Sequence, residues 1–492
     1  MEQMIGGYDF SGQHVLVAGL GKSGESVAQL LRQAQVDVTT YDQKKPTADV
    51  SSAVEIPWEK ITLVVTSPAF PPSSDFLQEA ARRSLPIWSE VEFAWNTRTE
   101  STQLSAPAPW IGITGTDGKT TTTEMIHAIL QANGFNAPAV GNIGVPVSQS
   151  VQDASADHFV VELSSFALHY TKSLQLDVAV WTNVSQDHLD WHGGFENYAH
   201  DKSTVFQRAR HAIIFNAEDP VVSAYASKAE VAAGCVRVGF TTKAPGANQI
   251  GVEGGWVVDR SSLHEGIEGA EDGRIIRLSS FSDQLKRADG SVYTHLLEDA
   301  LAAIGAALAQ HVSLEAIRHA LASFTLDPHR IELVASYVPE GVEAQRAIRF
   351  IDDSKATDIL AAQASLAAFP DKSVIWVCGG LAKGATFEQL VAQFAPKMKK
   401  ALVLGLDKAP FTEALQHSHI PYEEVDPSAN PDRSQGGAEV MARVVEEAGK
   451  LAQPGDVVLL APAAASMDEF LNYVDRGNQF AHAAQAWVAQ RS

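Results

Sequence analysis

A short apolar strand followed by a glycine-rich turn restricts the fold of this chain more than any other feature. The strand Trp110–Thr114 leads into the turn Gly115–Thr121 (GTDGKTT), and a helical pattern follows from Thr122 to Gln131. This order of elements is typical of a P-loop, whose backbone amides and helix N-terminus hold phosphate groups. The loop is shorter than the usual GxxxxGK[ST] pattern, but it keeps the lysine and threonine that reach a terminal phosphate and Mg²⁺. The motif therefore predicts an ATP site.

Polar groups follow two further strands, where an ATP site needs ligands for Mg²⁺. Glu162 ends the apolar strand His158–Glu162, and the strand Val178–Thr182 precedes a polar segment that contains Asp187 and His188. Ligands collect at the carboxyl ends of strands in open α/β sheets, and Mg²⁺ prefers oxygen ligands. We therefore expect Glu162 to bind the metal, and Asp187 and His188 to bind metal or substrate.

The first hundred residues contain a second nucleotide pattern. The strand His14–Ala18 leads into Gly19–Gly24 (GLGKSG), a helix follows to about Ala34, and a second strand ends at Asp42. A GxGxxG turn in a βαβ unit brings a diphosphate to a helix N-terminus, and the later acidic residue accepts hydrogen bonds from a ribose or base. Alone, this pattern indicates a nicotinamide-dependent dehydrogenase. Because the segment is short for a dinucleotide fold and a stronger nucleotide site follows, we predict a mononucleotide site.

The last third of the chain has polar residues at the ends of three apolar strands. These segments are Asp352–Asp358 (DDSKATD), Cys378–Gly384 (CGGLAKG) and Ala461–Ser466 (APAAAS). The carboxyl ends of parallel strands meet at one edge of a sheet, so we expect the three segments to converge. Their lysines and hydroxyl groups suit a small anionic substrate.

Helical patterns and short apolar strands alternate along most of the chain, which predicts α/β architecture with mostly parallel sheets. The polar, proline-rich segment Thr97–Pro109 and a second break near Asp327–Arg330 divide the pattern. Residues 243–290 are rich in glycine and charge, and we expect hairpins and loops there. We predict a Rossmann-like N-terminal domain, a P-loop ATPase-like central domain and a Rossmann-like C-terminal domain, at residues 1–105, 106–330 and 331–492.

Composition excludes several classes of partner. The 37 basic and 59 acidic residues give a net charge of −22, which repels nucleic acid and anionic membranes. Two cysteines, Cys235 and Cys378, are too few for a disulfide framework or a CxxC metal site. The N-terminal residues lack the regions of a signal peptide, and no apolar run approaches the roughly 18 residues that span a bilayer. We therefore expect a cytoplasmic monomer that binds neither nucleic acid nor membrane.

Taken together, the motifs resemble the Mur ligases of bacterial cell-wall synthesis over essentially the whole chain. General features of that family are TGTDGKTTT, DHLDWHG after Asn183, and the pair His329–Arg330. Features of its D-glutamate-adding branch are GLGKSG, ELSSFAL, DDSKATD, GGLAKG and ASMDEFLNYVDRGNQF. The resemblance implies an enzyme of peptidoglycan biosynthesis that uses ATP to join D-glutamate to UDP-N-acetylmuramoyl-L-alanine through an acyl-phosphate.

The resemblance also implies roles for single residues. The UDP part of the substrate would be bound by Lys22, Ser23, Asp42 and Gln43, and its diphosphate by Asn142. ATP would be bound by Gly115, Thr116, Asp117, Gly118, Lys119, Thr120, Thr121, Arg330 and Asp353. Mg²⁺ would be held by Thr120, Glu162, His188 and Lys202. D-glutamate would be bound by Thr357, Lys383, Ser466 and Tyr473. The catalytic set would be Lys119, His188, Lys202 and Lys355, with Lys355 on the transferred phosphate.

Lys202 is assigned by the resemblance alone, since it matches a lysine that is carbamylated in the family. Composition by itself would place it on the exposed surface of a helix.

The chain departs from the family pattern at a few positions. Ala167 replaces a glutamine, Leu296 and Asp299 replace asparagines, Leu326 replaces a glycine and Asp358 replaces an asparagine. The phosphate and metal residues persist, so we expect these departures to affect nucleotide affinity rather than the reaction.

Three alternatives for the function of the chain remain open. They are a Mur-type or folylpolyglutamate-type ligase for another amino acid, a nicotinamide-dependent oxidoreductase, and an ATP-binding regulatory protein.

Overall fold

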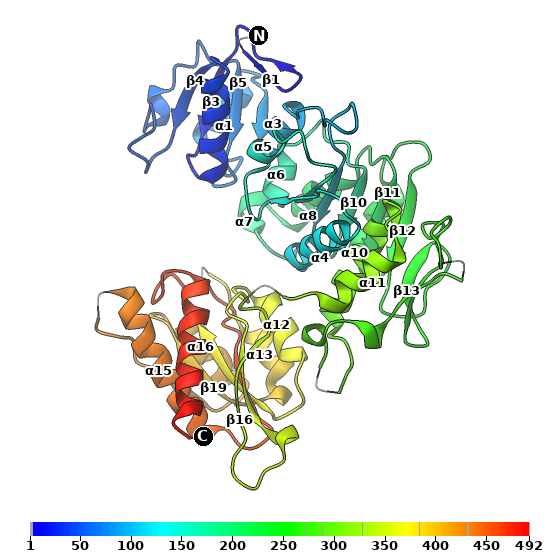
Figure 1. The fold of residues 1–492 in the computed structure, drawn as a ribbon. Coiled ribbons are helices and arrows are strands. Elements are labelled where there is room, and N and C mark those ends of the chain that lie inside the picture. The colour runs from blue at the N-terminus through cyan, green and yellow to red at the C-terminus, as the bar shows by residue number, and fades with distance from the viewer. Residues whose placement is uncertain are drawn as a thin grey trace. The chain divides into compact units, whose positions relative to one another are not determined.

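The computed structural model describes residues 3–270, 272–287, 289–326, 328–382, 384–430 and 432–491, with only the backbone at position 360. The chain divides into two compact units, Met1–Phe324 and Thr325–Ser492. Figure 1 shows that each unit combines sheets with covering helices, which agrees with the predicted α/β architecture. Within the described ranges, the helices are too short or too polar to cross a membrane.

The first unit begins with a small parallel sheet. Its strands, in spatial order, are β4 (Asp37–Tyr41), β3 (His14–Ala18), β5 (Leu63–Thr66) and β6 (Ile87–Ser89). The accompanying helices are α1 (Lys22–Gln33), α2 (Asp75–Arg82) and α3 (Glu90–Asn96), and a hairpin of β1 (Met4–Ile5) and β2 (Tyr8–Asp9) precedes them. Val27 and Leu31 are buried on one side of α1, in the same core as Val15 and Val17 of β3. This amphipathic pattern explains why the helix packs against the sheet.

A nine-stranded sheet forms the centre of the first unit, in the order β15-β14-β13-β12-β11-β10-β7-β9-β8. The strands are β7 (Trp110–Thr114), β8 (Ala139–Gly141), β9 (Phe159–Glu162), β10 (Val178–Trp181), β11 (Ala212–Asn216), β12 (Val236–Phe240), β13 (Gln249–Glu253), β14 (Trp256–Asp259) and β15 (Arg274–Arg277). Strands β7 to β13 run parallel, whereas β14 and β15 are antiparallel additions. The hairpins predicted for residues 243–290 are therefore confirmed.

The helices of this part cover the sheet. They are α4 (Lys119–Ala132), α5 (Val147–Ser150), α6 (Ser165–His169), α7 (Leu189–His192), α8 (Phe195–Ser203), α9 (Pro220–Lys228), α10 (Thr294–Ala309) and α11 (Leu314–Ser323). The helix after the P-loop begins at Lys119, earlier than the predicted start at Thr122. The reason is that Gly118 adopts a left-handed conformation and turns the chain directly into the helix. In Figure 1, α10 and α11 lie beside α4.

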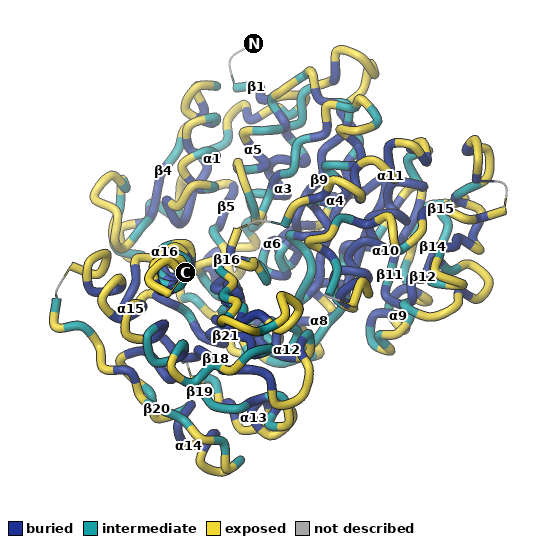
Figure 2. Tube along the Cα trace, turned by 60° about the horizontal axis from the view of Figure 1, so that its bottom comes forward, coloured by how far each residue is buried: buried dark blue, intermediate teal, exposed yellow. Residues whose placement is uncertain are grey.

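The second unit is built on a six-stranded sheet. In spatial order its strands are β16 (Glu332–Tyr337), β17 (Ile348–Asp352), β21 (Val457–Leu460), β18 (Val374–Gly379), β19 (Met398–Leu404) and β20 (Tyr422–Glu424). Only the edge strand β16 is antiparallel among these described strands. The helices are α12 (Ile359–Ala367), α13 (Glu388–Phe394), α14 (Ala409–His417), α15 (Arg433–Leu451) and α16 (Tyr473–Ala489). The central strands β21 and β18 are buried (Figure 2) and contribute to the cores on both faces of the sheet.

The three larger sheets each lie within one predicted domain range, but the first two ranges form a single compact unit. Helix α3 connects them through the carboxylates of the half-buried Glu90 and the buried Glu92. Glu90 accepts a hydrogen bond from the amide of Ser148 (2.6 Å), and Glu92 accepts one from the amide of Lys172 (2.8 Å). The boundary at residue 105 therefore stays a prediction.

Candidate active site

The P-loop between β7 and α4 has a shape that requires glycine at one position. Gly118 has a φ of 76°, and a Cβ atom there would lie 2.1 Å from Oδ1 of Asp299. The side-chain oxygen of Asn183 accepts hydrogen bonds from the amides of Thr116 (3.2 Å) and Asp117 (2.8 Å) and so holds the loop. The first turn of the following helix presents amides that have no acceptor within the helix itself, which is the arrangement that binds phosphate.

Lys119 folds back over this loop. Its Nζ donates hydrogen bonds to the carbonyl oxygens of Gly115 (2.9 Å) and Thr116 (2.6 Å). Hydrogen bonds of an ammonium group to phosphate are shorter and stronger than those to neutral carbonyls. A bound polyphosphate would therefore replace the two carbonyl oxygens as the hydrogen-bond partner of the Lys119 ammonium group.

Glu162 joins the P-loop helix to the segment after β8. It is 2% exposed, its Oε2 accepts a hydrogen bond from Oγ1 of Thr120 (2.9 Å), and its Oε1 accepts one from Nδ2 of Asn142 (2.8 Å). These three residues come from different elements, and the structure brings them into direct contact. A hydroxyl and a carboxylate oxygen this close are the kinds of ligand that Mg²⁺ prefers.

Lys202 lies beside the same loop and is not on the exposed surface that its composition suggests. It is 2% exposed on α8, its Nζ donates a hydrogen bond to the carbonyl of Gly115 at 2.6 Å, and it lies 4.7 Å from the centroid of the Tyr198 ring. Burial, and after it the charge of Lys119, holds the pKa of the Lys202 amine well below its usual value. The environment therefore disfavours the ammonium form of Lys202.

His188 comes directly before α7 in a left-handed conformation, with a φ of 51°. Its Nε2 lies 3.2 Å from Oδ2 of Asp187, and its ring centroid lies 4.7 Å from that of Phe166. Burial lowers the pKa of His188; Asp187 opposes this effect, and the charges of Lys202 and Lys119 add to it. Because metals bind the neutral imidazole, this environment fits the metal role predicted for His188.

A pocket in the first unit joins residues from both predicted nucleotide regions. It is lined by Ser23, Thr66, Ser67, Pro68, Ser89, Glu90, Val91, Gly141, Asn142, Glu162, Ser164, Phe166, Ala167 and Tyr170. Of the predicted site residues, Ser23 at the start of α1 therefore shares a pocket with Asn142 and Glu162. Sequence reasoning missed Phe166 and Tyr170, which are ordinary apolar positions of a helix pattern and become pocket walls only in the fold.

The other predicted UDP contacts do not line that pocket; Lys22 begins α1, and Asp42 and Gln43 follow β4. Asp42 accepts hydrogen bonds from the amides of Leu20 (2.8 Å) and Lys44 (2.8 Å), so its carboxylate shapes the GLGKSG turn. Burial raises the pKa of Asp42, but the amide hydrogen bonds outweigh it and the pKa lies below its usual value. Lys22 and Gln43 are exposed. Their contacts with a uridine nucleotide stay predictions.

In the second unit, Asp353 and Arg330 are neighbours. Asp353 is buried, and its carboxylate accepts hydrogen bonds from the amide of Ile331 (3.3 Å) and from the hydroxyl of Ser365. Burial raises the pKa of Asp353 to about 6, against the Ser365 hydrogen bond and the charge of Arg330. The Nε of Arg330 is buried and has no hydrogen-bond partner among the described residues. A buried guanidinium N–H that has no acceptor among the described residues fits the predicted contact with a nucleotide anion.

The predicted convergence of three strand ends is confirmed, because β17, β21 and β18 are parallel neighbours. This edge carries the half-buried Lys355 and Thr357, the buried Ser466 and the half-buried Tyr473. Lys383 lies outside the described residues. The binding of D-glutamate by this group stays a prediction.

Sequence reasoning did not single out Arg476, which organises this edge. The side chain is fully buried, and it donates hydrogen bonds to Oγ of Ser354 (2.9 Å), the carbonyl of Ser354 (2.9 Å) and the carbonyl of Ala464 (3.1 Å). Burial lowers the pKa of Arg476 to about 9. Its position on the apolar side of α16, one turn before the buried Phe480, is the sequence signal that could have predicted its burial.

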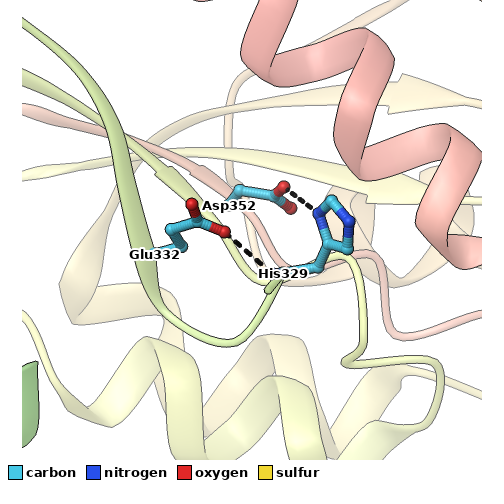
Figure 3. Close-up of side chains that lie close together, drawn as sticks. All are labelled: His329, Glu332 and Asp352. Carbon is cyan, nitrogen blue, oxygen red and sulfur yellow. Dashed lines mark hydrogen bonds and ion pairs between the residues drawn. The ribbon is translucent and has the colours of Figure 1, made fainter. Parts of the chain in front are cut away.

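Figure 3 shows a compact group of His329, Glu332 and Asp352, whose nearest ligand atoms all lie within 4.8 Å of one another. Oδ2 of Asp352 lies 2.7 Å from Nδ1 of His329, and Oε2 of Glu332 accepts a hydrogen bond from the amide of His329 (2.9 Å). The hydrogen bond to Asp352 raises the pKa of His329. These hydrogen bonds hold the segment that leads into β16, which explains why the three side chains lie close together.

The structure explains some of the departures from the family pattern. Asp358 caps α12, because its Oδ1 accepts a hydrogen bond from the amide of Ala361 (2.9 Å). Aspartate and asparagine are equally good caps, so the change preserves this role. Helix α12 begins directly after this cap, at Ile359. Asp299 accepts a hydrogen bond from Oγ1 of Thr122 (3.2 Å) behind the P-loop.

Comparison with known proteins defines the class of enzyme. The family model described as Mur ligase middle domain matches residues 113–270, and the one described as Mur ligase, glutamate ligase domain matches residues 329–464. The chain belongs to the Mur ligase family.

Several relatives share one name, UDP-N-acetylmuramoylalanine--D-glutamate ligase. The protein of that name from Bifidobacterium longum subsp. infantis is 48% identical, over 96% of this chain and 97% of its own. The one from Streptomyces coelicolor is 40% identical, over 97% of this chain and 98% of its own. Among solved structures, a MurF ligase from Thermotoga maritima in complex with ADP has a TM-score of 0.54 at 16% identity, covering 100% of this chain and 99% of that one. The last similarity concerns the fold alone.

Proposed function

We propose that this chain is a UDP-N-acetylmuramoyl-L-alanine:D-glutamate ligase that uses ATP and Mg²⁺ in peptidoglycan synthesis. One observation carries the proposal: Glu162 lines the substrate pocket together with Asn142 and is also bonded to Thr120 of the P-loop helix. A carboxylate in the pocket and a phosphate on the loop would therefore lie within reach of each other. The relatives named for this reaction support the choice of D-glutamate. ATP as a substrate agrees with the predicted location in the cytoplasm.

The residues present fit the proposed nucleotide and metal. The left-handed Gly118 and the start of α4 form a phosphate cradle, and Arg330 keeps a buried donor without a partner among the described residues. Thr120 and Glu162 would hold Mg²⁺, with the neutral ring of His188 as a further ligand. When bound, Mg²⁺ would supply charge neutralisation on the transferred phosphate.

The reaction has two steps. A carboxylate oxygen of the alanyl group attacks the γ-phosphorus of ATP, and the bond to the β–γ bridging oxygen breaks, which releases ADP and leaves an acyl-phosphate. The amine of D-glutamate then attacks the acyl carbon, loses a proton and expels phosphate. Lys119 would stabilise charge on the transferred group, and Lys355 would contact the same phosphate. Phe166 and Tyr170 would exclude water, which otherwise hydrolyses the acyl-phosphate.

Lys202 is proposed to act as a carbamate. Its neutral amine attacks CO₂, a nitrogen–carbon bond forms as one C=O π bond opens, and one proton leaves to solvent, which gives the neutral amine position a negative charge. Burial and the nearby Lys119 support this step because both disfavour the ammonium form. The resulting anion would be a further ligand for Mg²⁺.

The test offers purified protein UDP-N-acetylmuramoyl-L-alanine, ATP, Mg²⁺ and a panel of D- and L-amino acids, and measures phosphate release. Release that depends on D-glutamate supports the proposal. Release with another amino acid instead assigns a different Mur-type or folylpolyglutamate-type ligase. ATP binding without release identifies a regulatory protein, and turnover of NAD(P)H identifies an oxidoreductase.

A further inference from the structure

Asp201, next to Lys202 on α8, is the acceptor for two histidines. Its Oδ2 lies 2.7 Å from Nδ1 of His192 and 2.9 Å from Nδ1 of His169. The other ring nitrogen of His192 lies 3.0 Å from Oγ of Ser165. His192, Asp201 and Ser165 are 7%, 7% and 2% exposed. Ser165, His192, Asp201 and His169 therefore form one hydrogen-bonded chain, called here the Asp201 network.

The Asp201 network ties together three short helices. Helix α6 begins at Ser165 and ends at His169, so the network holds both of its ends, while α7 ends at His192. Helices this short are not stable alone and depend on tertiary contacts for their position. A single buried carboxylate on α8 thus bonds directly to both α6 and α7.

Each of these helices carries a part of the proposed active site. Helix α6 carries Phe166 and Ala167, which line the substrate pocket, and α8 carries Lys202. His188 immediately precedes α7. The ring of Phe166 contacts that of His188 at a centroid distance of 4.7 Å, and it stacks on His192 at 5.5 Å with an interplanar angle of 10°.

The order of serine, histidine and aspartate in the network also occurs in nucleophilic catalysis. Here Ser165 is buried at the start of α6, and among the described residues it does not line the substrate pocket. Both of its neighbours, Ser164 and Phe166, do. The network therefore positions side chains of the proposed active site and does not itself react with the substrate.

We propose that Asp201 is a positioning residue that keeps His188 and Lys202 in the arrangement required for metal binding. Removing its carboxylate leaves two imidazole N–H groups without their acceptor, one of them buried, and frees the short helix α7 to move. The inference rests on the proposed function, because it takes His188 and Lys202 as metal-binding groups. Groups that orient metal ligands typically change metal affinity or activity about 10–100-fold when they are replaced.

The experiment compares Asp201→Ala, Asp201→Asn and the control His200→Phe, which replaces an exposed histidine on the same helix. Mn²⁺ binding in the presence of ADP is titrated by electron paramagnetic resonance, and the urea midpoint is recorded for each variant. We expect Asp201→Ala to weaken Mn²⁺ binding at least 10-fold per folded molecule. Asp201→Asn should fall between it and the wild type, because the amide oxygen still accepts hydrogen bonds. His200→Phe should match the wild type.

The proposal is overturned if the Mn²⁺ affinity of Asp201→Ala lies within twofold of the wild-type affinity. It is also overturned if the loss of Mn²⁺ binding in Asp201→Ala is fully explained by the fraction of the variant that is unfolded. An equal loss in His200→Phe also overturns it. Mn²⁺ binding needs no amino-acid substrate, so the comparison remains decisive even if the wild type releases no phosphate with D-glutamate. In that case the proposed function fails and the role of Asp201 is still decided.

Discussion

At the scale of single residues, two lysines share one acceptor. The carbonyl oxygen of Gly115 accepts hydrogen bonds from Nζ of Lys119 at 2.9 Å and from Nζ of Lys202 at 2.6 Å. Two ammonium groups this close repel each other, and the more buried one gives up its proton more readily. The pKa of the more buried Lys202 is therefore lowered. This agrees with the proposed reaction of Lys202 with CO₂, while Lys119 is proposed to contact phosphate.

Lys119→Ala removes the cation proposed to stabilise the transferred phosphate. We expect kcat to fall by about 10³-fold or more, as for the loss of other groups that stabilise transition-state charge. Steady-state phosphate release at saturating D-glutamate measures the effect, and Lys228→Ala, an exposed lysine on α9, is the control. Turnover within tenfold of the wild type would remove Lys119 from the ATP site.

Lys202→Ala removes the group that the carbamate requires. We expect this variant to be inactive and to recover part of its phosphate release when a short carboxylic acid such as acetate is added, because the acid restores an anion near Mg²⁺. The rescue is measured as activity against acetate concentration, with Lys119→Ala as the variant that acetate should not rescue. An active Lys202→Ala enzyme would contradict the carbamate.

At the scale of elements, α10 places acidic side chains behind the P-loop helix. Asp299 is 4% exposed and bonded to Thr122 of α4. Its half-buried neighbour Glu298 has a pKa raised to about 7, first by burial and then by the charge of Glu218. Since α10 is otherwise rich in buried alanine and leucine, these carboxylates are exceptions in an apolar helix. We expect the titration of Glu298 to make the packing of α10 sensitive to pH.

Glu298→Gln should reveal this sensitivity. The Glu298 carboxyl group has a pKa of about 4.3 in the unfolded chain and about 7 in the folded protein. Its favourable contribution to the free energy of unfolding is therefore fully present below about pH 4.3 and is lost as the pH rises to about 7. We expect the variant to melt a few °C above the wild type at pH 8 and to lose this advantage at pH 5. Calorimetry at both pH values, with the exposed Glu315→Gln as control, measures the difference. An equal shift at both pH values would contradict the argument.

At the scale of the whole molecule, the chain divides into two compact units, Met1–Phe324 and Thr325–Ser492. Residues 325–492 contain a complete six-stranded sheet with a hydrophobic core on each face, and Arg476 connects its last helix to two strand ends. The small N-terminal sheet shares a unit with the nine-stranded sheet, and Glu90, Glu92 and the pocket that contains Ser23 and Glu162 connect the two sheets. The regions proposed to bind the substrate and the phosphates therefore belong to one compact unit.

The fragment 325–492 should fold without the rest of the chain, because the described residues that form its two cores all lie within it. We expect a single cooperative urea transition and a native-like circular dichroism spectrum. Arg476→Ala in this fragment should lower the free energy of unfolding by about 3 kcal/mol, since buried acceptors lose a charged donor. A fragment that lacks a cooperative transition would show that the second unit depends on the first.

Several features of this protein were determined by the sequence itself. The P-loop, the GLGKSG turn and the DDSKATD segment each consist of consecutive residues, and local backbone preferences place such residues side by side whatever surrounds them. Alternating strands and helices predicted the α/β layers, and the parallel arrangement of β17, β21 and β18 followed from that alternation.

Tertiary structure alone decided the properties that depend on distant neighbours. The contacts of Glu162 with Thr120 and Asn142, the burial of Lys202 and the hydrogen bonds of Asp201 all join elements whose distance no local pattern specifies. The pKa of a buried amine depends on how much water its neighbours exclude and on the charges they carry. For that reason the sequence pattern of α8 predicted a surface lysine, and the fold produced a buried one beside the P-loop.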